Sequence, residues 1–219
     1  MARDQVELMG SLGYSTFHVV GHDRGARTAH RMALDHAASV RSVSLLDIAP
    51  TLTMLTDVSK ESASRYWHWY FLSQPPLLPE TLIQSNADYF FESCVETWGR
   101  GRLSDVDARV VDEYRRCWND ADMIRASCED YRAAMTIDFE HDTADSATKI
   151  ACPVLVMWGS DGAMAKTYGM TAIWLQRCVH VDTEVVGGGH FFVDLQPLET
   201  CRKLTKHLWH YEQLWRSTS

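Results

Sequence analysis

A short stretch near the N-terminus constrains the fold of this chain more than any other feature. Residues 17–20 (FHVV) are mostly apolar and predict a buried strand, and residues 24–36 follow with alanines at helical spacing. Between these two segments the sequence reads GHDRG, so the chain turns sharply from strand to helix around Asp23. Glycine lacks the Cβ atom that would crowd such a turn, which suits the two glycines of the motif. The pattern predicts that the Asp23 side chain stands above the end of a strand.

Apolar runs bounded by turn residues return later in the chain. Residues 43–46 predict a second strand that ends at Asp47, and residues 154–158 and 179–186 predict two more. Helices are expected over residues 3–12, over residues 163–178 and from Pro197 onward, where Cys201, Leu204, Leu208, Tyr211 and Trp215 would face the sheet. Strand, helix and strand in succession form a βαβ unit. The sequence therefore predicts an α/β fold, with a mostly parallel sheet flanked by helices.

The middle of the chain has a different character. Residues 51–149 are rich in aromatic and charged side chains, carry a helical pattern and contain proline breaks at positions 75, 76 and 79. We predict that this segment is a helical cap inserted into a core made of residues 1–50 and 150–219.

Composition excludes several classes of protein. The 219 residues include 21 Lys and Arg against 29 Asp and Glu, and the net charge of -8 would repel a nucleic acid. No apolar run approaches the ~20 residues that span a bilayer, and the N-terminus lacks a signal-peptide core. Six scattered cysteines and ten histidines show no metal-ligand spacing. We expect a cytoplasmic protein with reduced thiols and no metal, cofactor, nucleic-acid or membrane partner.

Three titratable residues follow predicted strands in a meaningful order. Asp23 comes after the first strand, Asp47 after the second, and His190 follows three glycines after the last. Each has a structural interpretation: Asp23 as a helix N-cap, Asp47 as a cap before Pro50, and His190 as a loop histidine. Nucleophile, acid and histidine in this order are typical of hydrolases with a nucleophile elbow, here with Asp in place of Ser. The order favours a catalytic triad.

Five motifs together resemble the haloacetate (fluoroacetate) dehalogenase family, whose members have the α/β-hydrolase fold. They are GHDRGAR at 21–27, LDIAPT at 46–51, WHWYF at 67–71, CEDYR at 128–132 and GHF at 189–191. The resemblance implies that Asp23 is the nucleophile, His190 the general base and Asp47 its orienting acid. It further implies that the substrate carboxylate binds Arg24 and Arg27, and the departing halide His68, Trp69 and Tyr131. A small haloacid would be the substrate, and a homodimer is one possible assembly.

The chemistry of these residue types agrees with such roles. A carboxylate is ionised at neutral pH and needs no base to attack a saturated carbon. Arg24 and Arg27 lie three apart at the start of a helix, so both could clamp one carboxylate, although surface ion pairs are the alternative. Tryptophan offers only a hydrogen-bond donor, which suits a halide, and we assign this role to Trp69. Trp67, Tyr70 and Phe71 are expected to pack in the cap core.

The resemblance also implies about four strands and a helix ahead of the first strand seen here, including one donor of the oxyanion hole. The backbone N–H of Arg24 would be the other donor. Two alternatives stay open. An epoxide hydrolase also uses an Asp nucleophile but needs two cap tyrosines, of which Tyr131 is one candidate. The other alternative is a truncated, inactive chain that acts only in binding.

Overall fold

The computed structural model describes residues 1–218, and its centre is a four-stranded sheet in which every neighbouring pair is parallel. The strand order is β1-β2-β3-β4, with β1 at Phe17–His22, β2 at Val40–Leu46, β3 at Val154–Gly159 and β4 at Val181–Val186. The two inner strands are buried on both faces, as expected for a parallel sheet covered by helices. The predicted α/β fold is confirmed.

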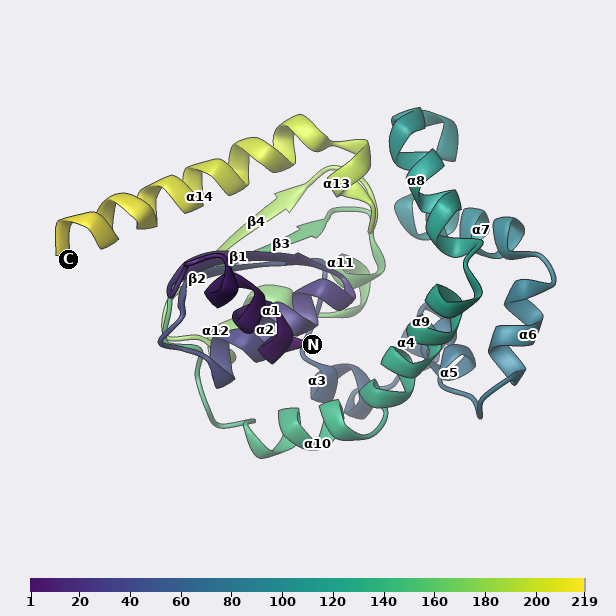
Figure 1. Cartoon of the computed structure of the whole chain (residues 1–219), viewed down its shortest axis with the longest axis horizontal. Coiled ribbons are helices and arrows are strands. Elements are labelled where there is room, and N and C mark those ends of the chain that lie inside the picture. The colour runs from purple at the N-terminus through teal and green to yellow at the C-terminus, as the bar shows by residue number, and fades with distance from the viewer. Residues whose placement is uncertain (219) are drawn as a thin grey trace.

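Helices cover both faces of this sheet. Figure 1 shows α14 (Pro197–Thr218) on one side, and α2 (Arg24–Asp35) and α12 (Met170–Arg177) on the other. The alanines of α2 at positions 26, 29 and 33 are almost completely buried, so the helix lies close to the strands. Three further helices belong to this part of the described chain: α1 (Ala2–Ser11), α11 (Ala163–Thr167) and the short α13 (Phe192–Leu195).

Two predictions about helices are wrong in detail. The helix expected over residues 163–178 is divided into α11 (Ala163–Thr167) and α12, because Tyr168 adopts an extended backbone. The sheet-facing side of α14 is predicted correctly only in part, since Leu204 packs against the strands but Trp215 is exposed. Cys201 is exposed, whereas Thr200 and His207 are buried. Polar contacts to the strands set this orientation, since Lys203 donates to Glu184 at 2.5 Å.

Helices occupy the whole connection between β2 and β3. They are α3 (Thr51–Thr56), α4 (Lys60–Arg65), α5 (Trp67–Leu72), α6 (Leu78–Gln84), α7 (Ala87–Gly99), the 3-10 helix η1 (Leu103–Asp105), α8 (Ala108–Trp118), α9 (Ala121–Ala134) and α10 (Ile137–Ala144). Figure 1 shows most of them beyond the ends of the strands, at the edge of the sheet where β1 leads into α2. We call this segment the helical wall. The division of the chain into two domains stays a prediction.

Other chain-wide features can be stated for residues 1–218. No helix there is both long enough and apolar enough to cross a membrane. No group of three or more His, Cys, Asp or Glu side chains in that range could hold a metal ion. The six cysteines are free. The cytoplasmic location and the homodimer stay predictions.

Candidate active site

The turn between β1 and α2 presents Asp23 in a strained conformation. Its backbone has φ 49° and ψ -122°, and a non-glycine residue is held in such a region only where the surroundings enforce it. A Cβ atom on Gly21 would come within 2.4 Å of the carbonyl oxygen of Gly25, so glycine is required at position 21. A Cβ atom on Gly25 would meet open space, so our steric argument for that glycine is wrong.

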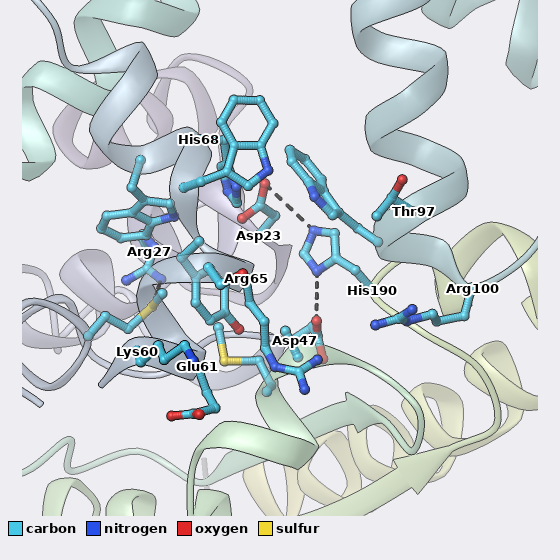
Figure 2. Close-up of a pocket in the computed structure, with 18 residues that line it drawn as sticks. Asp23, Arg27, Asp47, Lys60, Glu61, Arg65, His68, Thr97, Arg100 and His190 are labelled. Atoms are coloured by element: carbon cyan, nitrogen blue, oxygen red, sulfur yellow. Dashed lines mark hydrogen bonds and ion pairs between the residues drawn. The ribbon is translucent and has the colours of Figure 1, made fainter. Parts of the chain in front are cut away.

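The Asp23 side chain does not cap the helix that follows it. No side-chain hydrogen bond links it to the first turn of α2, so the N-cap interpretation is wrong. The carboxylate instead faces the imidazole of His190, and its side chain is 36% exposed, which leaves it open to a solute in the cavity. Figure 2 shows both groups pointing toward each other.

His190 lies between two carboxylates. Its Nε2 is 3.7 Å from Oδ2 of Asp23, and its Nδ1 is 2.7 Å from Oδ2 of Asp47. Asp47 is buried at the end of β2 with φ 55°, and its other oxygen accepts the backbone N–H of Gly159 at 3.2 Å. The cap interpretation of Asp47 is therefore wrong. The structure brings the three residues of the predicted triad together.

The charges of this triad depend on one another. Burial by itself would lower the pKa of His190, but hydrogen bonds and the charges of Asp23 and Asp47 outweigh it and raise the pKa to about 10. Burial likewise raises the pKa of Asp23, but the hydrogen bond to His190 and its charge outweigh burial and lower this pKa far below its usual range. At neutral pH, Asp23 is an anion beside a protonated His190.

The loop that carries His190 is fastened to the helical wall. The backbone N–H groups of Gly189 and His190 donate to the carbonyl oxygens of Gly99 and Trp98 at 3.0 and 2.8 Å. A Cβ atom on Gly189 would lie 2.2 Å from the Trp98 oxygen, so only glycine allows this approach. The position of the imidazole therefore depends on the last turn of α7.

A second histidine, His22, forms a hydrogen bond with the backbone of His190. His22 Nε2 lies 2.9 Å from the carbonyl oxygen of His190, and the two rings are 4.5 Å apart. Burial, followed by the charge of His190, lowers the pKa of His22 to about 4, so this ring is neutral at pH 7. Because a carbonyl oxygen only accepts, Nε2 of His22 carries the proton. Sequence reasoning missed His22, although it stands within the turn motif itself.

The two predicted arginines have different surroundings. Arg27 is buried beside Asp23 and donates to the Ala49 carbonyl and the Thr51 hydroxyl, both at 3.0 Å. Its Nε has no partner among the described residues. Burial, with the nearby charge of Arg24, lowers the pKa of Arg27 to about 10. This guanidinium thus remains largely charged at neutral pH and keeps one donor free.

Arg24 is held by acidic side chains. It pairs with the Asp130 carboxylate and, at 3.4 Å, with Asp138, which fits the ion-pair alternative for this residue. Its guanidinium also lies 5.0 Å from the centre of the Tyr131 ring, and its buried Nη1 has no partner among the described residues. Arg24 is outside the set of described residues that line the Asp23 cavity, so the structure does not place both arginines in one wall.

The predicted halide-binding side chains lie close together on the helical wall. His68 and Trp69 come from α5 and Tyr131 from α9, and the Tyr131 ring centre is 5.8 Å from each of the other two. Burial lowers the pKa of His68 to about 3, and its buried Nδ1 has no partner among the described residues. Burial and the charge of Asp23 raise the pKa of Tyr131, so its phenol stays protonated. His68 and Trp69 line the cavity, and the Tyr131 ring packs edge-on against both of them.

The neighbours of Trp69 depart from expectation. Trp67 is 45% exposed and lines the cavity, and Tyr70 is 38% exposed, so the expected core packing is wrong for both. Phe71 does pack against the core. In a helix, residues three or four apart share a face, so Trp67 and Tyr70 lie on the exposed face of α5, and the aromatic run alone does not indicate which face is exposed.

Asp23, Asp47 and His190 share one cavity of about 420 Å³. The cavity also contains residues that sequence reasoning missed: Tyr66, Trp98, Lys60, Arg65 and Arg100. Trp98 lies with its ring 4.1 Å from His68 and its carbonyl on the His190 backbone. No local motif marks these residues, because their roles depend on contacts between distant segments.

The comparisons with known proteins agree with this geometry. The sequence pattern of the α/β hydrolase fold matches residues 1–197. The chain belongs to the α/β-hydrolase family. A fluoroacetate dehalogenase from a Burkholderia species is 47% identical over 208 residues, which cover 95% of this chain and 68% of that protein. The resemblance to the haloacetate dehalogenases is thereby confirmed.

Two other members of the α/β-hydrolase family extend the comparison. A solved structure from Nostoc sp PCC 7120, assigned to the α/β hydrolases, superposes with a TM-score of 0.91 at 48% identity and covers 94% of this chain and 70% of its own. A soluble epoxide hydrolase from Corynebacterium sp. (strain C12) is 26% identical over 90% of this chain and 68% of its own length.

Proposed function

We propose that this α/β hydrolase removes halide from small 2-haloacids such as haloacetates, through an ester on Asp23. The observation that carries the proposal is the anionic Asp23 on a strained turn, facing His190 inside a cavity. An ionised carboxylate can attack the carbon that bears the halogen, so that a C–O bond forms as the carbon–halogen bond breaks. The similarity to a fluoroacetate dehalogenase supports the same chemistry.

The second step regenerates the carboxylate. Formation of the ester removes the negative charge of Asp23, which is one of the two charges that raise the pKa of His190. The imidazole then loses its proton more easily and can take one from a water molecule that attacks the ester carbonyl. Asp47 keeps the Nδ1 proton in place and stabilises the imidazolium that results. The products are a 2-hydroxyacid, a halide and a proton.

The remaining side chains bind the two ends of the substrate. The free Nε of Arg27 supports a charge-assisted hydrogen bond to the substrate carboxylate. Arg24 pairs with Asp130 and Asp138 and lies outside the cavity lining, so we assign this contact to Arg27 alone. On the helical wall, His68, Trp69 and Tyr131 would donate to the departing halide. A halide leaves water only where such donors replace its hydration, and preorganised donors in a buried site do so effectively.

The histidine variant tests the mechanism. In His190→Ala, attack by Asp23 needs no base, so chloroacetate or fluoroacetate should yield about one halide per chain and then stop. Intact-mass spectrometry should show the ester as an added carboxymethyl group. Asp23→Ala should release no halide, while Asp122→Ala, at an exposed position on α9, is the control for the loss of one acid. Continued turnover in Asp23→Ala would contradict the proposal.

One observation favours a second candidate function, epoxide hydrolysis. Tyr66 lines the cavity, and burial followed by the charge of Asp47 raises its pKa, so it could serve with Tyr131 as the second acid over an epoxide oxygen. The epoxide hydrolase relative supports this alternative. Diol formation from styrene oxide, abolished in Tyr66→Phe, would favour the epoxide over the haloacid.

A further inference from the structure

The outer part of the Asp23 cavity has a surplus of positive charge. Lys60, Arg65 and Arg100 line it together with a single acid, Glu61. Within residues 1–218 no carboxylate lies within 4.0 Å of any of these three cations. Glu61 and Arg65 have the spacing of a helical ion pair, and yet the arginine is turned elsewhere. Its side chain is therefore available to a ligand in the cavity.

The fold fixes the backbone positions of two of these cations, and of their side chains Arg65 is half-buried and Arg100 exposed. Arg65 lies at the end of α4, a helix whose start is fixed by a reciprocal hydrogen-bonded cap between Ser59 and Ser62. Arg100 has φ 56° and directly follows the two carbonyl groups that bind the His190 loop. In Figure 2 both guanidinium groups lie on the Asp47 side of His190, whereas Asp23 lies on the other. The reacting group and the outer cations thus occupy separate parts of one cavity.

The size of the cavity exceeds what a haloacetate requires. A haloacetate has the bulk of three or four water molecules, on the order of 100 Å³, whereas the cavity measures about 420 Å³. The charges divide in the same way. Asp23 and Asp47 are balanced by Arg27 and the protonated His190, but the outer cations exceed their one acid. The remaining volume of the cavity and its surplus positive charge therefore suit a second anionic group.

We propose that this cavity accepts 2-halodicarboxylic acids, with the second carboxylate bound by Arg65 and Arg100. The inference rests on the proposed haloacid chemistry and names a substrate class for it. Asp23 forms the new C–O bond as the halide leaves with the bonding electrons, and water then cleaves the ester while His190 takes a proton. A 2-hydroxydicarboxylic acid, a halide and a proton are released. Arginine suits the outer role because its planar fork matches a carboxylate.

The test compares three chloroacids by their rates of chloride release. 2-Chlorosuccinate and 2-chlorobutyrate have the same carbon chain length and differ in the charge at the far end, while chloroacetate reports on the dehalogenation itself. We expect kcat/KM for 2-chlorosuccinate to exceed that for 2-chlorobutyrate by roughly tenfold, because a charge-assisted contact adds to binding. Arg65→Met and Arg100→Met should each reduce this ratio by roughly threefold or more, given the partial exposure of the site. Arg65→Lys, which keeps the positive charge, should retain most of the preference for 2-chlorosuccinate over 2-chlorobutyrate.

Arg109→Met is the matched control, since this exposed arginine pairs with Asp107 and lies outside the cavity lining. We expect Arg109→Met to have the same ratio of kcat/KM values for 2-chlorosuccinate and 2-chlorobutyrate as the unmodified chain. If chloroacetate is converted but the ratio is one or less, or is the same in the Arg65→Met/Arg100→Met double variant, the second-carboxylate site is refuted and the dehalogenase proposal stands. Absence of chloride release from all three acids would refute both.

Discussion

The two sides of the Asp23 cavity are built on different principles. On the sheet side, Asp23 and Asp47 have positive φ angles at strand ends, and both carboxylates contact His190. On the helical wall, His68 and Trp69 are held by ring packing, and the buried Nδ1 of His68 has no partner among the described residues. The sheet side therefore presents paired charges suited to bond formation, whereas the helical wall presents unpaired polar atoms suited to binding an anion.

The largest expected effect comes from Asp47→Asn. If the sheet side performs the chemistry, this variant should still release about one halide per chain rapidly, but ester hydrolysis should slow by roughly 10³- to 10⁴-fold. Rapid-quench measurement of halide separates the two phases. A slower first phase with unchanged ester hydrolysis would contradict the assignment of ester hydrolysis to the sheet side and of halide binding to the helical wall.

The same variant has a predictable pH dependence. Asp47 is one of the two anions that raise the pKa of His190 to about 10, so its removal should lower that pKa. In the unmodified chain kcat/KM should fall as pH rises through about 10, because His190 and Arg27, whose pKa is also about 10, lose the charges that attract the substrate anion. In Asp47→Asn the fall should begin at lower pH. A pH profile that is identical in both proteins would contradict this.

Arg27→Lys should have the next largest effect, a loss of about 10²-fold in kcat/KM, since an ammonium cannot reproduce the guanidinium's several fixed donors. The Ala49 carbonyl and the Thr51 hydroxyl would compete with the substrate for the remaining donors. Steady-state kinetics with chloroacetate measures the change. Arg31→Lys, in the same helix but paired with Asp35 and Asp145, is the control.

Trp69→Phe sharpens the comparison from the helical wall. The ring remains but the N–H donor is lost, so the first phase of halide release should slow by about tenfold to 10²-fold, with ester hydrolysis unchanged. Trp209→Phe makes the same change on α14, at a side chain that is 65% exposed and lies outside the cavity lining, and should have little effect. Equal effects from the two variants would remove the assigned role of Trp69.

The smallest expected effect is the loss of stability in Gly189→Ala. Its Cβ atom would approach the Trp98 carbonyl oxygen to 2.2 Å, and relief of this overlap should cost about 1–3 kcal/mol in the free energy of unfolding. Gly187→Ala, where a Cβ atom meets no other atom within 4 Å, is the control. Urea denaturation of both variants measures the difference.

The strands and the predicted triad were accessible from the sequence because their signals are local. Residues 17–25 contain a strand, a turn and a helix start in one motif, Asp47 follows a strand directly, and His190 follows one after three glycines. The order of the three residues then predicted that they meet, which the distances confirm. Their catalytic roles stay a proposal.

The remaining features depend on contacts that no local pattern encodes. The carbonyl oxygen of Trp98 accepts a hydrogen bond from the backbone N–H of His190, and His22 donates one to the carbonyl oxygen of the same residue. The break at Tyr168 was missed because its sequence permits a continuous helix. The prediction for α14 holds at Leu204 but is wrong at Cys201 and Trp215, because ion pairs with the strands also contribute to the rotation of this helix.

The hydrogen bonds from Gly189 and His190 to the last turn of α7 have one more consequence. Any outward swing of that helix must drag the imidazole with it or break both bonds. The last turn of α7 and the His190 ring are thus mechanically coupled, so a substitution that displaces this turn should also displace the imidazole.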